Sequence, residues 1–219
     1  MPSTTLHFVR HGKVENPDHL LYERLPGFHL SELGVRMAQA TARYIAADPG
    51  MSQAATVISS PLERTRETAG EILKELNPVR QGRGEAPLAL STDVRLIEAG
   101  NNFRGTRVGH GQGALWRPRN IRLLSNLWRP SWGESYRHIA ARVGAFAHEM
   151  TMEHPGEHLI VVSHESPIFS FRHKLETGHP EHNMLLRHTA LASVTSVTFD
   201  CESGKVLDIS YVDPAADVS

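Results

Sequence analysis

Three junctions between a predicted strand and the segment after it carry arginine or histidine. Arg10 and His11 end the first of these strands. Arg64 lies in the first turn of a helix after the second strand, and His164 directly follows the third. The carboxyl ends of parallel strands meet at one edge of a sheet, where open α/β sheets bind ligands. We therefore expect two guanidinium groups and two imidazoles to converge there, which suits an anion such as phosphate.

Each of these residues also has a simpler interpretation. Arg10 and His11 could end a strand for structural reasons, Arg64 could be a solvated helix charge, and His164 could be an ordinary loop histidine. Their repetition at equivalent points along the chain favours a shared site. Gly12 fits that interpretation, because glycine permits a sharp turn or the close approach of the backbone to a ligand.

The elements that must position these residues alternate along the chain between strand and helix patterns. Helices are predicted from the N-cap Ser31 to about 47, from the N-cap Ser60 (with Pro61 and Glu63 in the first turn) to about Leu76, from about 133–135 onward, and from Ser166 and Pro167 onward. Residues 77–87 are predicted to form a loop. Strands are predicted at 5–10, 55–58, 88–91 and 158–163, followed by a β-hairpin of 191–199 and 205–212.

This alternation predicts an α/β fold. The expected architecture is a three-layer αβα sandwich, with a mainly parallel sheet, helices on both faces and a C-terminal β-hairpin. Residues 1–213 are expected to form one domain, with a lid-like insertion at about 99–133. Residues 214–219 are expected to form a flexible tail.

Composition narrows the classes of function. The chain has 219 residues, 40% of them apolar, and a net charge of −1, so it has no global attraction to nucleic acid or membrane. No apolar segment is long enough to span a bilayer. The single Cys201 excludes an internal disulfide and fits a cytoplasmic location. The fourteen histidines are scattered and form no metal-binding motif, so we expect no metal and no other cofactor.

The ordered set of motifs resembles a known family. The set comprises Arg10-His11-Gly12, Ser60-Pro61-Leu62-x-Arg64-Thr65, Arg95-Leu96-x-Glu98, Gly133-Glu134-Ser135 and Val162-Ser163-His164. Their order and approximate spacing over residues 5–212 resemble the histidine phosphatase superfamily, in its phosphoglycerate-mutase-like branch. The resemblance implies that phosphoryl groups are transferred through a phosphohistidine without a metal.

The same resemblance implies a role for each motif residue. His11 would be the nucleophile, and Arg10, Arg64 and His164 would bind the phosphoryl oxygens. Glu98 would protonate the leaving alkoxide and then take a proton from the water that hydrolyses the phosphohistidine. Only the family pattern selects Glu98, so Asp93 and Glu15 remain alternatives.

The chain departs from the usual family pattern at several positions. Lys13 stands where an acidic residue is common, Asn16 comes five rather than six residues after the histidine, and Glu165 replaces a glycine. Asn102-Phe103-Arg104-Gly105 stands in place of Gly-x-Trp-Glu-Gly. These departures argue against a glycolytic mutase. Four residues are candidates for substrate specificity: Asn16, Arg24, Arg104 and Glu165.

The segment between Glu98 and Glu134 contains six arginines, all three tryptophans and no acidic residue. Basic residues interleaved with aromatic ones can bind nucleic acid. They can equally form a solvated loop, or a mobile lid that brings an arginine to an anionic substrate. The neutral to acidic remainder of the chain makes nucleic acid the least favoured of the three.

The leading hypothesis is therefore a metal-independent phosphatase that acts on a small phosphorylated substrate. The alternatives are a phosphoglycerate-type phosphomutase, a catalytically weak phosphate-binding module and, last, a nucleic-acid-binding protein. The sequence leaves the physiological substrate and the oligomeric state open.

Overall fold

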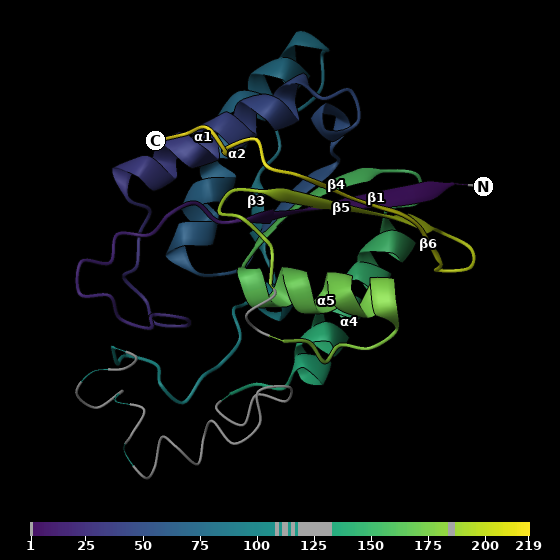
Figure 1. The fold of residues 1–219 in the computed structure, drawn as a ribbon. Coiled ribbons are helices and arrows are strands. Elements are labelled where there is room, and N and C mark those ends of the chain that lie inside the picture. Colours follow the sequence, from purple (N-terminus) through teal and green to yellow (C-terminus); the bar gives the residue numbers. More distant parts are fainter. Residues whose placement is uncertain (1, 108–109, 111–113, 115–116, 118–132, 184–186) are drawn as a thin grey trace.

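A single mixed sheet organises the chain (Figure 1). The computed structural model describes residues 2–107, 110, 114, 117, 133–183 and 187–219. In those residues six strands form the sheet in the order β3-β2-β4-β1-β5-β6. The strands are β1 (Ser3–Arg10), β2 (Thr56–Ser59), β3 (Leu90–Thr92), β4 (His158–Ser163), β5 (Val194–Asp200) and β6 (Val206–Val212). The first four are mutually parallel, whereas β5 and β6 form an antiparallel hairpin beside β1.

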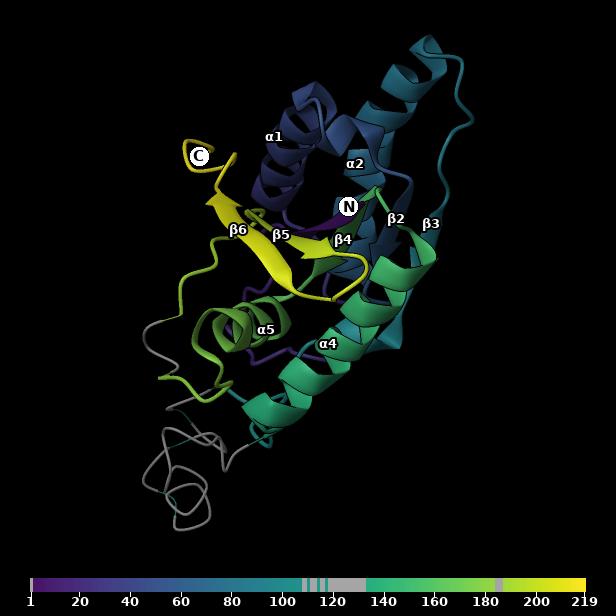
Figure 2. The same cartoon turned by 90° about the vertical axis from the view of Figure 1, so that its right-hand side faces the viewer.

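Helices cover both faces of this sheet (Figures 1 and 2). The helices α1 (Glu32–Ala47) and α2 (Glu63–Gly82) pack on one face, and α4 (Tyr136–Glu153) and α5 (Glu165–Thr177) pack on the other. Two short 3₁₀ helices, η1 (Met51–Gln53) and η2 (Val94–Leu96), lie in connections. The predicted αβα sandwich with a C-terminal hairpin is thereby confirmed.

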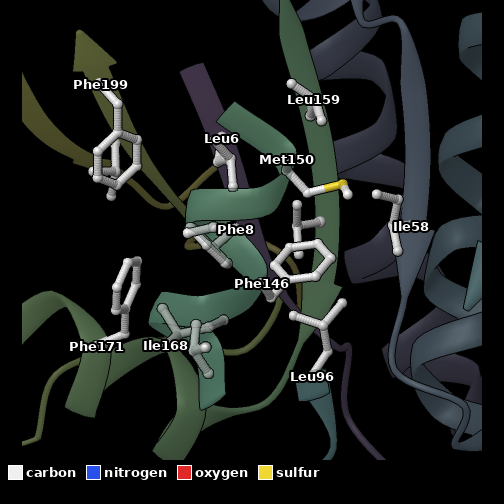
Figure 3. Close-up of a cluster of buried hydrophobic side chains, with 14 residues drawn as sticks. Leu6, Phe8, Ile58, Leu96, Phe146, Met150, Leu159, Ile168, Phe171 and Phe199 are labelled. Atoms are coloured by element: carbon white, nitrogen blue, oxygen red, sulfur yellow. The ribbon is translucent and has the colours of Figure 1, made fainter. Parts of the chain in front are cut away.

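Two apolar layers hold the sandwich together, one on each side of the sheet. In the layer under α4 and α5, Phe8 of β1 packs with Phe146 and Phe171 (Figure 3). In the layer under α1 and α2, Val9 packs with Ile45 and Ile72. Neighbouring residues of β1 thus enter opposite layers, and for this reason the strand is buried from Thr4 to Val9.

The second helix differs from its predicted bounds at both ends. Its N-cap is Leu62, which makes no side-chain cap, rather than Ser60. The Ser60 N–H instead continues the sheet by donating to the Val162 carbonyl. The helix also passes through Pro78 and ends at Gly82, so residues 77–82 are not the predicted loop. Asn77 exchanges two hydrogen bonds with Leu88, which fastens this last part of the helix to the following segment.

The other strands and helices lie within a few residues of their predicted positions. Within the predicted insertion at 99–133, residues 108–109, 111–113, 115–116 and 118–132 lie outside the described residues, so the lid stays a prediction. The single-domain assignment and the flexibility of the tail also stay predictions, although Ala215 is buried and Arg36 donates to the Ser219 carbonyl. None of the described helices is long and apolar enough to cross a membrane.

Two glycines allow the end of β1 to touch the start of α1. A Cβ on Gly12 would lie 2.4 Å from the carbonyl oxygen of Gly34, and a Cβ on Gly34 would lie 1.9 Å from that of Lys13. The close approach expected of Gly12 is therefore made to the backbone of Gly34. It fixes the loop that carries His11 against the helix.

We expect Gly34→Ala to lower the free energy of unfolding by about 1–3 kcal/mol, because the added methyl group overlaps a backbone oxygen. Gly70→Ala in α2 is the matched control, since no atom lies within 4 Å of its added Cβ. That control should stabilise the protein by up to about 1 kcal/mol through helix propensity. Urea unfolding of both variants measures the two effects. Equal changes in the free energy of unfolding would show that the backbone contact at Gly34 does not exclude a methyl group.

Candidate active site

The carboxyl ends of three neighbouring strands bring the predicted site residues to one edge of the sheet. In the register of β1 with β4, Arg10 lies opposite Ser163, and in that of β2 with β4, Ser59 lies opposite Val162. The His11 N–H donates to the Ser163 carbonyl at 3.1 Å. The strands therefore end at nearly the same level.

His11 is held with one ring nitrogen available. It is 2% exposed, and its Nδ1 lies 2.8 Å from the carbonyl oxygen of Gly12. A carbonyl oxygen only accepts, so Nδ1 carries the proton and Nε2 keeps its lone pair. Burial lowers the pKa of His11 well below 6.5, and the charges of Arg64 and Arg10 lower it further. The imidazole is consequently neutral at physiological pH, which is the form that a nucleophile needs.

Arg64 connects the two histidines. This fully buried residue donates from Nε to His11 Nε2 at 3.3 Å and from Nη2 to His164 Nδ1 at 3.2 Å. Nη2 also donates to the Glu23 carbonyl, and the guanidinium stands 4.8 Å from the centre of the Tyr22 ring. The remaining nitrogen, Nη1, is buried and has no hydrogen-bond partner among the described residues.

His164 faces His11 across this guanidinium, with ring centres 5.1 Å apart. Because Arg64 only donates, His164 accepts at Nδ1 and donates from Nε2 to Ser60 Oγ at 2.8 Å. Burial lowers the pKa of His164 well below 6.5, with a further decrease from Arg64 and His11. The Ser60 hydroxyl thus orients His164, which accounts for the failure of Ser60 to cap α2.

Arg10 supplies the second guanidinium of the site. Nη1 donates to the Thr189 carbonyl, and Nη2 lies 3.4 Å from a carboxylate oxygen of Glu165. Its Nε is buried without a partner among the described residues. Two cationic side chains beside His11 therefore each keep a buried nitrogen free to donate. Such donors cost free energy unless an anion occupies the space between them.

Arg10 and His11 line a cavity of about 270 Å³, whereas Arg64 and His164 lie behind its lining. Its wall also includes Tyr22, Glu23, Glu98, Asn101, Tyr136, Glu165, Ser166 and Arg187.

Of the three carboxylates considered as general acid, Glu98 lies in this cavity. One of its carboxylate oxygens accepts the Ala99 N–H at 2.7 Å. Asp93 instead accepts from the Arg95 backbone and side chain, at the start of η2. Glu15 lines a separate surface hollow.

The segment that carries Glu98 is fixed at both ends. The Ser163 hydroxyl donates to the Leu96 carbonyl at 2.7 Å. On the other side, the Glu134 N–H donates to the Gly100 carbonyl at 2.8 Å, and a Cβ on Gly133 would lie 2.2 Å from the same oxygen. The Gly133-Glu134-Ser135 motif therefore holds the Glu98 segment and also begins α4, for which Ser135 is the N-cap.

The four candidate specificity residues are dispersed. Glu165 lines the cavity beside Arg10. Arg24 binds the Glu134 carboxylate at 2.7 Å and the Glu98 carbonyl at 2.6 Å, so it supports the wall. Asn16 exchanges two hydrogen bonds with Leu20 and lines the separate hollow. Arg104 is exposed and does not line the cavity, although its charge lowers the pKa of Glu23.

Glu23 and Arg187 line the cavity and were not indicated by the sequence. Glu23 is 9% exposed, has a positive φ of 34°, and keeps its buried Oε2 without a partner among the described residues. Burial, and then the charge of Glu98, raises its pKa from 4.5 to about 7. Neither residue belongs to a motif or a periodic pattern. Only the short sequence distance between Glu23 and the Arg-His-Gly loop could have suggested it.

The described residues contain no group of three or more His, Cys, Asp or Glu side chains that could hold a metal ion. The positive charge beside His11 comes from Arg10 and Arg64.

Comparison with known proteins agrees with the geometry. The family model described as the histidine phosphatase superfamily (branch 1) matches residues 6–211. The chain therefore belongs to the histidine phosphatase superfamily.

One relative covers the chain almost completely. The uncharacterized protein Rv0525 of Mycobacterium tuberculosis is 41% identical over 217 residues, which make up 99% of this chain and 100% of that protein.

Solved structures show the same fold at lower identity. A mycobacterial glucosyl-3-phosphoglycerate phosphatase has a TM-score of 0.73 and 22% identity, covering 96% of this chain and 99% of its own. A phosphoglycerate mutase from Bacillus anthracis has a TM-score of 0.71 and 20% identity, covering 98% and 95%. These two similarities establish the phosphoglycerate-mutase-like fold.

We expect Glu23 to make stability depend on pH. The unfolded carboxyl loses its proton near pH 4.5, whereas the folded one keeps it to about 7. Between these values the folded state binds more protons, so the free energy of unfolding falls as the pH rises, by roughly 3 kcal/mol in total. Glu23→Gln should remove this dependence.

Urea unfolding of the wild type and of Glu23→Gln across that pH range measures the difference. Glu153→Gln, an exposed change on α4, is the control and should leave the wild-type pH dependence intact. A Glu23→Gln variant with the same slope as the wild type would show that the Glu23 carboxyl titrates normally.

Proposed function

We propose that the protein is a metal-independent phosphomonoester phosphatase that works through a phosphohistidine on His11. The observation that carries the proposal is the neutral His11, which lies beside the buried Arg64 and the partly exposed Arg10. Each of these two arginines keeps a buried nitrogen that has no partner among the described residues. This arrangement provides a nucleophile and a binding site for a phosphoryl group at the same point.

In the first step, His11 Nε2 attacks phosphorus and forms the P–N bond while the bond to the alkoxide oxygen breaks. Glu98 gives its proton to that oxygen, so the alcohol leaves uncharged. Arg10 and Arg64 bind the phosphoryl oxygens, whose charge they stabilise during transfer. His164, which the family pattern also assigns to these oxygens, has its two ring nitrogens engaged by Arg64 and Ser60 and holds the Arg64 guanidinium in place. His11 Nδ1 keeps its proton throughout, and its hydrogen bond to the Gly12 carbonyl keeps the ring oriented.

In the second step, the Glu98 carboxylate takes a proton from water, whose oxygen attacks phosphorus. The P–N bond breaks, inorganic phosphate leaves, and His11 and Glu98 return to their starting states. A mutase would instead return the phosphoryl group to an organic acceptor before water attacks. A cytoplasmic location is part of this proposal, because a single cysteine, Cys201, fits a reducing compartment.

The wild type, freed of metals with EDTA, should form a labelled protein phosphate from a labelled phosphomonoester and release inorganic phosphate. The label should be acid-labile and alkali-stable, as expected of phosphohistidine. His11→Ala should form none and lose nearly all turnover. His148→Ala, an exposed change on α4, is the matched control and should behave as the wild type does.

Substantial turnover by His11→Ala would remove His11 from its role. Activity that EDTA abolishes and one metal restores would indicate a metallohydrolase. Transfer of the label to an alcohol in preference to water would favour the mutase, and a wild type without phosphoenzyme or turnover would favour a binding module.

Glu98→Gln should slow the hydrolysis of alkyl phosphates by ~10²–10⁴-fold, the usual contribution of a general acid. For an aryl phosphate such as p-nitrophenyl phosphate, the rate of the first step should fall less, since its leaving group is stable as an anion. If water attack then limits the rate, labelled phosphoenzyme should accumulate in the variant.

Asp93→Asn and Glu15→Gln are the matched comparisons, because both residues lie outside the cavity. Equal small losses on alkyl and aryl substrates in Glu98→Gln, without accumulation, would assign the proton transfer to another group.

A further inference from the structure

A third arginine, Arg187, reaches the cavity from the side formed by α4 and α5. Its Nη1 donates to Ser166 Oγ at 2.8 Å, and its Nη2 donates to the Tyr136 hydroxyl at 3.1 Å. The guanidinium carbon also stands 5.4 Å from the centre of the Tyr136 ring. Tyr136 begins α4 and Ser166 lies in the first turn of α5, so the starts of two packed helices hold this side chain.

The third contact of Arg187 fixes its orientation. Nε donates to His182 Nε2 at 3.1 Å. His182 can accept there because its Nδ1 proton points at the Pro180 carbonyl, 2.9 Å away. Burial lowers the pKa of His182 to about 4, so the ring stays neutral at physiological pH. It also stacks on Tyr136 with ring centres 3.8 Å apart, which limits its movement.

Arg187 forms no ion pair with a carboxylate of the protein. Every Asp and Glu of the chain falls in the described residues, and none of them forms an ion pair with Arg187. The nearby cavity carboxylates have other partners, since Glu165 pairs with Arg10 and Glu134 pairs with Arg24 and Arg142. All three hydrogen-bond partners of Arg187 in the described residues are uncharged.

The hydrogen bonds of Arg187 to the described residues use only part of its donors. A guanidinium has five N–H groups, and Nε, Nη1 and Nη2 each use one of them on His182, Ser166 and Tyr136. In the part of the chain that the structure describes, each of the two terminal nitrogens therefore keeps one N–H for a further acceptor. Paired donors of this kind match the two oxygens of a carboxylate or a phosphate.

We propose that Arg187 binds a second anionic group of the substrate, beside the phosphoryl group that Arg10 and Arg64 hold. The substrate class is then a phosphomonoester that also carries a carboxylate or a second phosphate. This inference rests on the proposed phosphatase function, because it names what the same cavity accepts. Arg187 acts as a specificity residue, and Tyr136, Ser166 and His182 position it.

Binding of phosphonates tests this subsite without requiring turnover. Calorimetry would compare ω-phosphonoalkanoates and α,ω-bisphosphonates of increasing chain length with alkyl phosphonates of the same length. At the length that spans the two sites, the second anion should tighten binding to the wild type by about 10–100-fold, the usual effect of a charge-assisted pair. The carboxylate and bisphosphonate series identify which group Arg187 prefers.

Arg187→Gln should abolish this preference, and Arg187→Lys should keep part of it, because the charge remains but the paired donors do not. Arg172→Gln on α5 is the matched control. That arginine pairs with Glu176 and does not line the cavity, so its variant should keep the full preference. Should Arg187→Gln fail to fold, as judged by thermal melting, Ser166→Ala should still reduce the preference.

Two outcomes would overturn the inference. One is a wild type that binds no probe with two anionic groups more tightly than the alkyl phosphonate of the same length. The other is an equal loss of affinity for both kinds of probe in Arg187→Gln. Hydrolysis of the corresponding phosphomonoesters is scored separately. Tighter binding of the probes with a second anion, without any hydrolysis, would contradict the proposed phosphatase function but support the Arg187 subsite. Hydrolysis without tighter binding of those probes would support the phosphatase function and contradict the subsite.

Discussion

The site depends on a guanidinium buried without an opposite charge in contact with it. Arg64 is fully buried, and its described hydrogen-bond partners are two neutral imidazoles and the Glu23 carbonyl. Burying a cation in this way costs several kcal/mol unless it is compensated. The sheet and both helical layers must hold it in place. In the proposed function, the phosphoryl group of the substrate supplies an opposite charge and offsets part of this cost.

The same cation sets the protonation of its neighbours. Its charge is the second cause, after burial, of the lowered pKa of both His11 and His164. The two histidines can therefore lie with ring centres 5.1 Å apart without repulsion between two imidazolium ions. Glu23, whose carbonyl accepts from Arg64, also lines the cavity. Its carboxyl adds no negative charge there below about pH 7, because it remains protonated.

The sequence predicted most of the fold and the centre of the site because both rest on local patterns. Apolar runs such as 158–163 mark strands buried on both faces, and Arg10, His11, Arg64 and His164 follow strand ends that parallel pairing must align. The errors arose where a tertiary contact replaced a local one. Ser60 is an ordinary helix cap by sequence, but its hydroxyl binds His164. Pro78 is an ordinary helix breaker, but Asn77 and Arg80 fasten that turn to neighbouring segments.

Glu23 and Arg187 could not be predicted because their environment is made by segments distant in the chain. Glu23 is buried by the approach of the Glu98 segment, and Arg187 is oriented by residues from α4, α5 and the loop after α5. The family motifs end at the phosphoryl group, where every member needs the same chemistry. Discrimination between substrates requires contacts beyond that group, and residues outside the motifs must provide them. In this chain, Arg187 and Glu23 lie outside the motifs and line the cavity, so substrate choice is expected to depend on these two side chains.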